Sequence, residues 1–194
     1  MIKKKTALIF GISGQDGSYL AHFLLTKNYK IVGITRNNSL NNLSRLKRLK
    51  IINKVTVIKG TALNKKFLNK LIKKDISIKE IYYFAGDSSV VKSFKHPDTS
   101  LKSNTIGILN ILMSVKDINK KIKIFNAASG QIFGNKKINH YSENSLIDPQ
   151  SPYGVAKASG FWLSKIYRKA HNLYSCSGIL FNHESPLRSK HFVT

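Results

Sequence analysis

Short apolar runs alternate with segments of helical periodicity along the whole chain. Runs rich in Ile, Val, Phe and Tyr predict strands, and the segments between them repeat apolar residues at the spacing of a helix. The predicted strands are Thr6–Phe10, Lys30–Thr35, Val55–Lys59, Glu80–Phe84, Ile122–Ala127 and Ser175–Phe181. The predicted helices are Tyr19–Leu25, Lys65–Ile72, Leu101–Val115 and Tyr153–His171, and the polar segment Asn135–Gln150 predicts a surface loop.

Continuous apolar strands separated by helices are typical of a parallel sheet that is covered on both faces. The predicted fold class is therefore α/β, a Rossmann-type doubly wound parallel sheet with helices on both faces. A chain of 194 residues can form one good core, whereas two full domains would be crowded. Residues 1–194 are thus expected to form one nucleotide-binding, Rossmann-like domain.

The net charge of the chain raises nucleic-acid binding as a further possible function. The chain has 33 Lys and Arg against 9 Asp and Glu, a net charge of +24 that would fit a nucleic-acid binder. The lysines are scattered over every predicted helix and loop, however, and form no arginine-rich stripe with interleaved aromatic residues. We therefore expect no specific nucleic-acid partner, but a positive field that favours anionic substrates, nucleotides included.

Composition also bears on the location of the protein in the cell and on metal binding. No apolar run approaches the roughly 18–20 residues of a membrane span, so no membrane partner is expected. The single cysteine, Cys176, excludes an intrachain disulfide and suits a reducing cytoplasm. No metal site is predicted, because Cys176 and the histidines outside the motifs below lack metal-ligand spacing. These histidines are His22, His96, His140, His171 and His191.

A glycine-rich turn follows the first predicted strand and opens a helix. Its sequence is Gly11-Ile-Ser-Gly14-Gln15-Asp16-Gly17, with the three glycines three residues apart. In this context glycine allows a tight turn and close approach of the backbone to a pyrophosphate, which then lies at the positive end of the helix. The turn predicts a dinucleotide site, although a glycine-rich turn without a ligand remains the alternative.

The end of the second predicted strand indicates which dinucleotide is bound. An NAD enzyme has an acid here for the ribose 2′-hydroxyl, whereas this chain reads Thr35-Arg36-Asn37-Asn38-Ser39. Arg36 can contact a 2′-phosphate, and Asn37 and Ser39 can donate hydrogen bonds to it. NADP is therefore the predicted cofactor, and a solvated arginine is the alternative.

A tyrosine and a lysine four residues apart open the last predicted helix. The spacing puts Tyr153 and Lys157 on one helical face, where the ammonium can lower the pKa of the phenol and make it a usable acid and base. Ser151 and Pro152 fit the N-cap and the first helical position. One such pair is expected by chance in so lysine-rich a chain, so the pair gains weight from its position after a strand and loop with Ser129.

Together these motifs resemble the extended short-chain dehydrogenase/reductase family, and within it the GDP-mannose 4,6-dehydratases. The resemblance extends from Lys5 to Thr194. Its segments are Gly14–Leu20, Ala85–Val90, Ser151–Lys157 and, most specific of all, Gly178–Pro186.

The resemblance implies a mechanism and a set of site residues. Members of the family oxidise the sugar at C4 with bound NADP, and Tyr153 would take the hydroxyl proton while Lys157 and Ser129 hold the geometry. A glutamate then removes the C5 proton, water leaves C6, and a 4-keto-6-deoxy sugar nucleotide results. Ser88 and Asn182 would face the substrate. The predicted cofactor-binding residues are Gly11, Gly14, Gln15, Asp16, Gly17, Arg36, Asn37, Ser39, Thr61, Ala85, Gly86, Ser88, Lys157, His183 and Arg188.

The chain departs from the family pattern at the catalytic glutamate. Gln131 occupies that position, and an uncharged amide cannot take the C5 proton. Asp87, where the family has a neutral residue, is the one acid we expect near the nicotinamide. Thr61 stands where an acid that binds adenine is expected, and Thr99 where a tyrosine is common.

The resemblance also implies a further, mostly helical lobe beyond Thr194 that holds the sugar nucleotide, so the chain is interpreted as truncated.

The predicted function is that of a GDP-mannose 4,6-dehydratase with a GDP-sugar as substrate. The protein is also expected to form a homo-oligomer in which Phe161 and Trp162 pack across a two-helix face. One alternative is a sugar-nucleotide 4-epimerase or 4-keto reductase without dehydration, which Gln131 favours. Another is a non-catalytic NADP-binding fragment, and a basic nucleic-acid-binding protein comes last.

Overall fold

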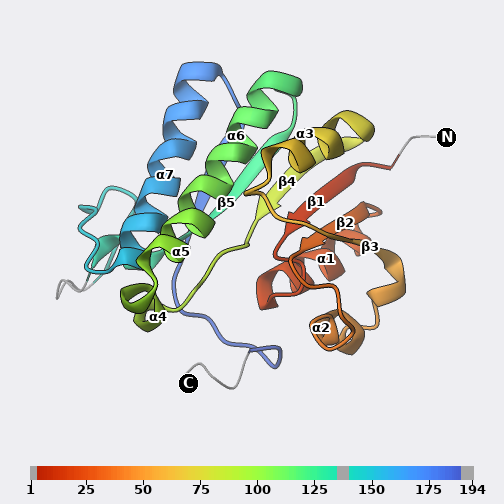
Figure 1. Cartoon of the computed structure of the whole chain (residues 1–194), viewed down its shortest axis with the longest axis horizontal. Helices are drawn as coiled ribbons and strands as arrows, with labels where there is room; N and C mark the ends of the chain where they lie inside the picture. The colour runs from red at the N-terminus through yellow and green to blue at the C-terminus, as the bar shows by residue number, and fades with distance from the viewer. Residues whose placement is uncertain (1–3, 135–139, 189–194) are drawn as a thin grey trace.

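A single six-stranded parallel sheet organises the molecule (Figure 1). The computed structural model describes residues 4–134 and 140–188. The strand order is β3-β2-β1-β4-β5-β6, and all five pairings are parallel. The strands are β1 (Thr6–Phe10), β2 (Lys30–Thr35), β3 (Val55–Lys59), β4 (Ile78–Tyr83), β5 (Lys123–Ser129) and β6 (Ser175–Leu180). Because the order reverses between β1 and β4, a crevice is expected at the carboxyl ends of these two strands.

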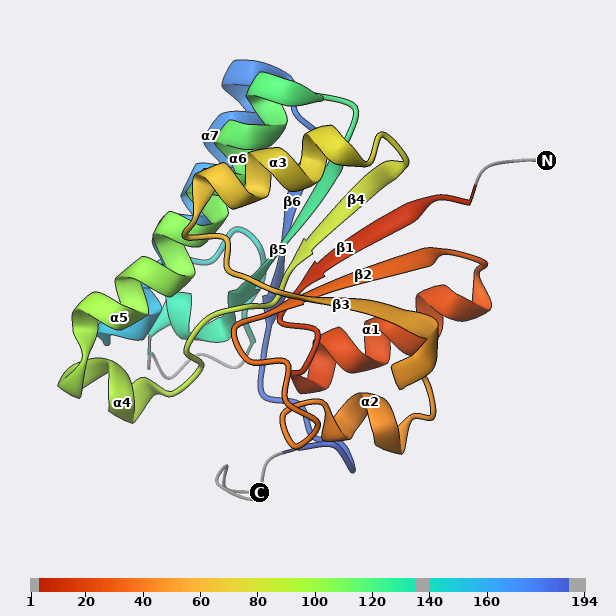
Figure 2. The ribbon, with the colours of Figure 1, turned by 45° about the vertical axis from the view of Figure 1, so that its right-hand side comes forward.

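Helices cover both faces of the sheet. Helices α3, α6 and α7 lie on one face, and α1 and α2 lie on the other (Figure 2). The α-helices are α1 (Gln15–Thr26), α2 (Ser44–Arg48), α3 (Lys65–Lys74), α4 (Val90–Lys95), α5 (Pro97–Leu101), α6 (Gly107–Ile118) and α7 (Pro152–His171). Short 3₁₀ turns span Ile52–Lys54 and Gly130–Phe133, and a π-helical segment spans Lys102–Ile106. The predicted doubly wound α/β fold is confirmed.

The apolar pattern explains the two layers. All five residues of β1 are buried, as expected for a central strand with helices on both sides. On one face the strands pack against Ile108, Ile111, Leu112 and Val115 of α6, which recur at helical spacing.

The predicted strands agree closely with the structure. The bounds of β1, β2 and β3 are confirmed, and the other three differ from prediction by at most two residues at an end. Of the predicted loop Asn135–Gln150, residues 140–150 have no helix or strand, whereas 135–139 lie outside the described residues, as does His191.

One predicted helix is confirmed only in part. The segment Leu101–Val115 is helical throughout, but residues Lys102–Ile106 are π-helical before α6 begins. Within the π-helical residues, Asn104 Nδ2 donates to Ser100 O (3.1 Å) and Asp87 O (3.0 Å), and Ser103 Oγ donates to Thr99 O (2.8 Å). Side chains that bond to the carbonyls of the preceding turn compete with the regular helical ladder, which explains the widened turn.

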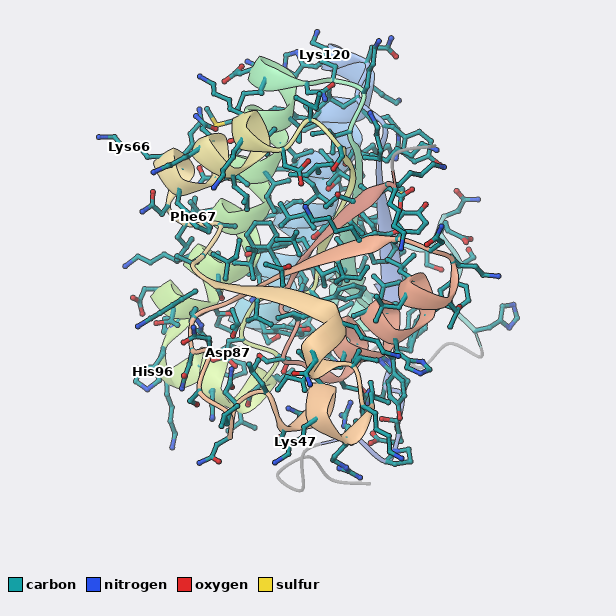
Figure 3. The ribbon with its side chains drawn as sticks, turned by 90° about the vertical axis from the view of Figure 1, so that its right-hand side faces the viewer. Lys47, Lys66, Phe67, Asp87, His96 and Lys120 are labelled. Atoms are coloured by element: carbon teal, nitrogen blue, oxygen red, sulfur yellow. The ribbon has the colours of Figure 1, made fainter. Side chains whose placement is uncertain are left out.

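The surface lysines lie on separate elements. Lys47 on α2, Lys66 on α3 and Lys120 after α6 are exposed and point away from one another (Figure 3). In the described ranges, no helix is both long enough and apolar enough to cross a membrane.

Candidate active site

The glycine-rich turn joins β1 to α1 and leaves the start of the helix open. Gly11 has φ +84°, and a Cβ there would lie 2.9 Å from the backbone of Phe84 and Ala85. A Cβ on Gly17 would lie 2.3 Å from Gly11 O, so α1 can approach the turn only through glycine. Gly14 is the N-cap and provides no side-chain cap, so the free N–H groups of the first turn of α1 remain available to an anion.

Two adjoining clefts meet at this turn. The first has a volume of about 320 Å³ and contains the catalytic candidates, and the second has a volume of about 260 Å³ and lies towards β2 and β3. Both are lined by Gly11, Gly14, Phe84 and Gly86. The clefts therefore form a two-part site across the point where the strand order reverses, where a dinucleotide fits in this kind of sheet.

The second cleft contains most of the residues predicted to contact the adenosine half. Arg36, Asn37 and Thr61 line it, and so do Ala85 and Gly86. Ser39 does not line either cleft, because its backbone N–H donates to Asn37 Oδ1 (2.9 Å) and its hydroxyl accepts from Asn42 N (3.4 Å). These contacts make Ser39 part of the loop that positions Arg36.

The first cleft brings the predicted catalytic side chains together. Ser129 is the last residue of β5, and Tyr153 and Lys157 lie one turn apart at the start of α7. The predicted N-cap is correct: Ser151 Oγ accepts from Gly154 N (3.0 Å), with Pro152 in the first turn. Sequence spacing and strand position together thus locate this group correctly.

Lys157 is half-buried in the wall of the first cleft. Its Nζ donates to Ala127 O (2.8 Å) and lies 5.7 Å from the centre of the Tyr153 ring. Burial lowers the pKa of Lys157 to about 8, and the negative charge of Asp16 opposes this shift only in part. Such an ammonium gains and loses its proton near physiological pH.

The pKa of Tyr153 is shifted in the direction opposite to the prediction. Burial raises the pKa of the phenol, the charge of Asp87 raises it further, and a hydrogen bond with Ser129 opposes both. The prediction that Lys157 lowers the pKa of this phenol is therefore wrong for this arrangement. The physical reason is that the nearest acceptor of the Lys157 ammonium is Ala127 O, and desolvation of the phenol dominates.

Gln131, at the position of the family's glutamate, and Asp87, the predicted substitute base, line neither cleft. Gln131 follows β5, and its backbone N–H donates to Ser129 Oγ (3.2 Å). Asp87 lies in the loop after β4, where its carboxylate accepts from Ser89 N (3.3 Å). Asp87 is near enough to affect the pKa of Tyr153, but its role as a base stays a prediction.

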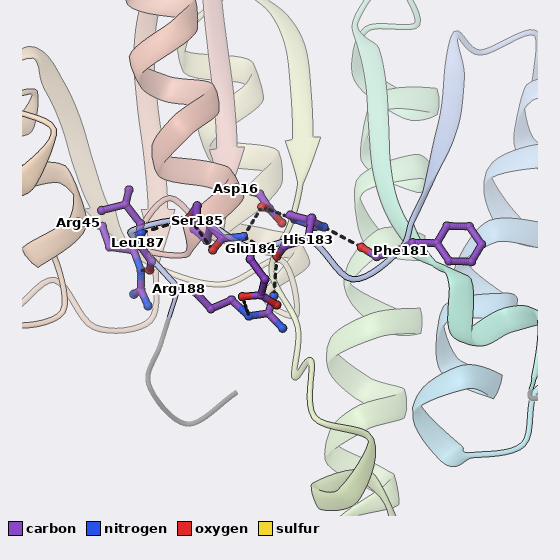
Figure 4. A network of polar contacts seen from close by, with 9 residues as sticks. Asp16, Arg45, Phe181, His183, Glu184, Ser185, Leu187 and Arg188 are labelled. Carbon is purple, nitrogen blue, oxygen red and sulfur yellow. Dashed lines mark hydrogen bonds and ion pairs between the residues drawn. The ribbon is translucent and has the colours of Figure 1, made fainter. Parts of the chain in front are cut away.

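Residues 181–188, which we name the strap, cross back from β6 to the glycine-rich turn (Figure 4). His183 Nε2 lies 2.8 Å from Asp16 Oδ1, and its Nδ1 lies 2.7 Å from Phe181 O. Both interactions raise the pKa of His183. Gln15 donates from Nε2 to His183 O (3.3 Å), and its Oε1 accepts from Ser185 Oγ (2.7 Å).

The strap places further predicted residues in the first cleft. Asn182, His183 and Arg188 line it from the strap, and Ser88 lines it from the loop after β4. Thr99 lines neither cleft, and its carbonyl accepts from Ser103 Oγ. Among the residues that the structure describes, no three His, Cys, Asp or Glu side chains are grouped to hold a metal ion.

Arg45 is a cleft residue that sequence reasoning missed. Its side chain lines the first cleft and contacts both the strap and the glycine-rich turn. It lies in a five-residue helix, and no local motif marks it.

Comparison with known proteins adds a family match. The family model described as GDP-mannose 4,6 dehydratase matches residues 8–194. "GDP-mannose 4,6 dehydratase 2" of Caenorhabditis elegans is 39% identical over 202 residues, which cover 99% of this chain and 52% of that protein. The chain thus spans about half the length of the curated relatives it matches.

Solved structures share the fold. A dTDP-glucose 4,6-dehydratase from Bacillus anthracis in complex with NAD superposes with a TM-score of 0.79 at 25% identity, over 97% of this chain and 58% of that one. A UDP-glucuronic acid 4-epimerase from Bacillus cereus in complex with NAD gives 0.83 at 25% identity, over 96% and 59%. The chain therefore shares its fold with a dehydratase and an epimerase.

Proposed function

Because the chain belongs to the GDP-mannose 4,6-dehydratase family, we propose that it forms the nucleotide-binding part of an NADP-dependent lyase that acts on GDP-mannose. The observation that carries the proposal is a single cleft that joins the glycine-rich turn to Ser129, Tyr153 and Lys157. A dinucleotide site and an acid–base group in one cleft are what oxidation at a sugar carbon requires.

The residues present fit a dinucleotide. Gly11 and Gly17 allow the turn to pack closely against the backbone around it, and the uncapped start of α1 can receive the pyrophosphate. Two of the similar structures are complexes with NAD, which supports a nicotinamide cofactor. We assign NADP because Arg36 lines the second cleft at the end of β2, where an NAD enzyme would have an acid.

The chemistry of the chain's own residues follows from their positions. The bound nicotinamide would supply reversible two-electron oxidation of the sugar at C4. Tyr153 would accept the C4 hydroxyl proton, Ser129 would orient that hydroxyl, and Lys157 would stabilise the resulting negative charge while it is protonated. A phenol with a raised pKa stays protonated at neutral pH and cannot accept a proton, so this role requires the ammonium to turn towards the phenol and lower its pKa when substrate is present.

Gln131 supports a second candidate function. Among the described residues that line the first cleft, the one carboxylate is Asp16, which pairs with His183. Removal of general base catalysis typically costs about 10²–10⁴ in rate. A 4-epimerase or 4-keto reductase would need only the redox residues, and a non-catalytic NADP-binding subunit would need none.

A homo-oligomer completes the proposal. Trp162 is 42% exposed on α7 and contacts Phe161 edge to face, with ring centres 5.4 Å apart. A packed partner helix would cover this exposed ring. A cytoplasmic location stays a prediction from the sequence.

The test is to incubate the purified chain with GDP-mannose and NADP, and to follow cofactor binding by calorimetry and the sugar product by mass spectrometry. The proposal predicts NADP binding and a 4-keto-6-deoxy product that Tyr153→Phe abolishes. Gln131→Glu should raise the dehydration rate by about 10²-fold or more, because it restores the base.

The other outcomes separate the alternatives. Binding with C4 oxidation or epimerisation but no loss of water would establish the redox-only enzyme. Binding without any change in the sugar, in the chain and in Gln131→Glu alike, would indicate a non-catalytic subunit. Failure to bind NADP would contradict the proposed function as a whole.

A further inference from the structure

Arg45 joins two walls of the first cleft that are far apart in the sequence. Its Nε donates to Leu187 O (2.7 Å) and its Nη1 donates to Ser13 O (3.0 Å). The guanidinium is planar and rigid, so one side chain holds both carbonyls at a fixed separation. Figure 4 shows Arg45 and Leu187 at the end of the strap nearest α2.

The two acceptors belong to the segments that would enclose a dinucleotide. Ser13 lies inside the glycine-rich turn, and Leu187 is a buried residue of the strap. His183 and Arg188, which line the cleft, lie on either side of Leu187, and Arg188 Nη1 donates to His183 O (3.0 Å). The position of Leu187 therefore affects both cleft residues.

The other contacts of the strap with α1 lie further from Leu187. Gln15 is a neutral amide that contacts His183 O and Ser185 Oγ, and Asp16 pairs with the half-exposed ring of His183. Hydrogen bonds from a charged guanidinium are about twice as strong as neutral ones. Arg45 thus links the glycine-rich turn to Leu187 directly by charge-assisted hydrogen bonds, in addition to the Ser185 hydroxyl, which accepts from Leu187 N (3.1 Å).

Arg45 is also linked to the second cleft. The loop before α2 carries Arg36 and Asn37, and Asn42 fixes this loop by donating from Nδ2 to Thr35 Oγ1 (3.2 Å) and to Asn37 O. Asn42 precedes Arg45 by less than one helical turn. One short segment therefore carries the residues that face the adenosine half and the side chain that holds the strap.

We propose that Arg45 is a positioning residue that holds the strap on the glycine-rich turn, so that His183 and Arg188 face the pyrophosphate and nicotinamide half of the cofactor. The inference rests on the proposed binding of NADP. In this proposal Arg45 has no contact with the adenosine half. Loss of Arg45 should therefore weaken binding of the nicotinamide half and leave binding of the adenosine half unchanged.

The experiment compares Arg45→Met and Arg45→Lys with Arg48→Met, a control at an exposed arginine of the same helix. Calorimetry measures NADP and adenosine 2′,5′-bisphosphate, which lacks the nicotinamide half. Both Arg45 variants are expected to weaken NADP binding about tenfold, since charge-assisted hydrogen bonds are lost. Binding of the bisphosphate should stay within about twofold, and Arg48→Met should bind both ligands normally.

Hydrogen exchange in the strap provides a readout that needs no ligand. Amides of residues 181–188 should exchange faster in both Arg45 variants than in the unchanged chain, and Arg48→Met should not differ from it. Unchanged exchange in Arg45→Met would overturn the inference whatever the ligands do. This measurement separates it from the proposed function, which fails if the unchanged chain binds no NADP.

Two further results would also overturn it. If Arg45→Lys binds NADP as tightly as the unchanged chain, charge alone matters and the fork geometry does not. If both ligands weaken equally while the melting temperature falls, Arg45 supports the fold as a whole and does not position the strap.

Discussion

Lys157 shows how a single buried charge connects folding with chemistry. Its ammonium lies half-buried beside β5, and among the described residues its hydrogen-bond acceptor is Ala127 O. Desolvation of this charge opposes folding, and it lowers the pKa of Lys157. The side chain is nevertheless placed beside Tyr153, where its charge would assist proton transfer.

Replacement of Lys157 should therefore stabilise the protein. The pKa of Lys157 falls from 10.5 unfolded to about 8 folded, so between these values the unfolded chain binds more protons and stability rises with pH. Lys157→Met should abolish that rise and increase the melting temperature at pH 7 by about 3 °C. Thermal melts from pH 6 to 10 measure both effects, with Lys169→Met, an exposed position on the same helix, as control. A lower melting temperature for Lys157→Met alone would contradict this account.

Arg36 should determine the choice between NADP and NAD. It lines the second cleft, and its positive charge is near enough to oppose the rise in the pKa of buried Tyr83. Arg36→Ala should weaken NADP binding by roughly 30-fold, because a charge-assisted hydrogen bond to the 2′-phosphate is lost, and should leave NAD binding nearly unchanged.

Calorimetry with both cofactors measures the preference, and Arg48→Ala is the matched control. Equal weakening of NAD and NADP would show that Arg36 holds the loop and does not read the phosphate.

At the scale of elements, the turn between β1 and α1 depends on glycine more than on any other residue type. Gly17→Ala would bring a Cβ to 2.3 Å from Gly11 O, which lies in the backbone and cannot move without opening the turn. We expect a loss of about 2 kcal/mol in the free energy of unfolding and at least tenfold weaker NADP binding, because the start of α1 moves away from the pyrophosphate.

Denaturant unfolding and calorimetry test this, and His22→Ala, an exposed substitution on the same helix, should change neither quantity. A Gly17→Ala variant with unchanged stability would show that the turn tolerates a wider approach of α1.

Elements with long apolar repeats could be predicted from sequence, and short ones could not. Strands β1 to β3 are bounded by polar residues and glycine, so their limits are visible. Helices α2, α4 and α5 have five or six residues each, too few to show a period. The π-helical break depends on Asn104, whose side chain bonds to Asp87 O across the fold, and a helical repeat carries no sign of that contact.

Some residues of the candidate site could likewise be predicted from local sequence patterns, and others only from the fold. The turn from Gly11 to Gly17 and the pair Tyr153 and Lys157 are local patterns, so spacing alone finds them. The strap depends on contacts such as Asp16 with His183, which are 167 residues apart, and such pairings follow only from the folded sheet. Resemblance to relatives therefore identified His183 and Arg188, while Arg45 required the structure.

At the scale of the whole molecule, the helices on the two faces of the sheet present different surfaces. Helix α2 contacts the strap through Arg45, whereas α7 carries an exposed apolar stripe. Val155, Trp162 and Ile166 are 44%, 42% and 54% exposed, and their spacing places them along one side of the helix. Exposed aligned apolar residues of this kind mark a contact surface.

We expect this stripe to be the contact between two copies of the chain. A stable contact needs about 800 Å² per partner, and a 20-residue helix with its neighbours can provide an area of that order. Ile166→Glu places a charge within the stripe and should shift the protein to monomers, while NADP binding, which uses the opposite edge of α7 near Tyr153, persists. Tyr174→Glu is the control, because Tyr174 is 60% exposed but lies outside the helix. Analytical ultracentrifugation decides the matter: if the unchanged chain sediments as a monomer, the stripe on α7 serves some other contact and the site must function within a single copy.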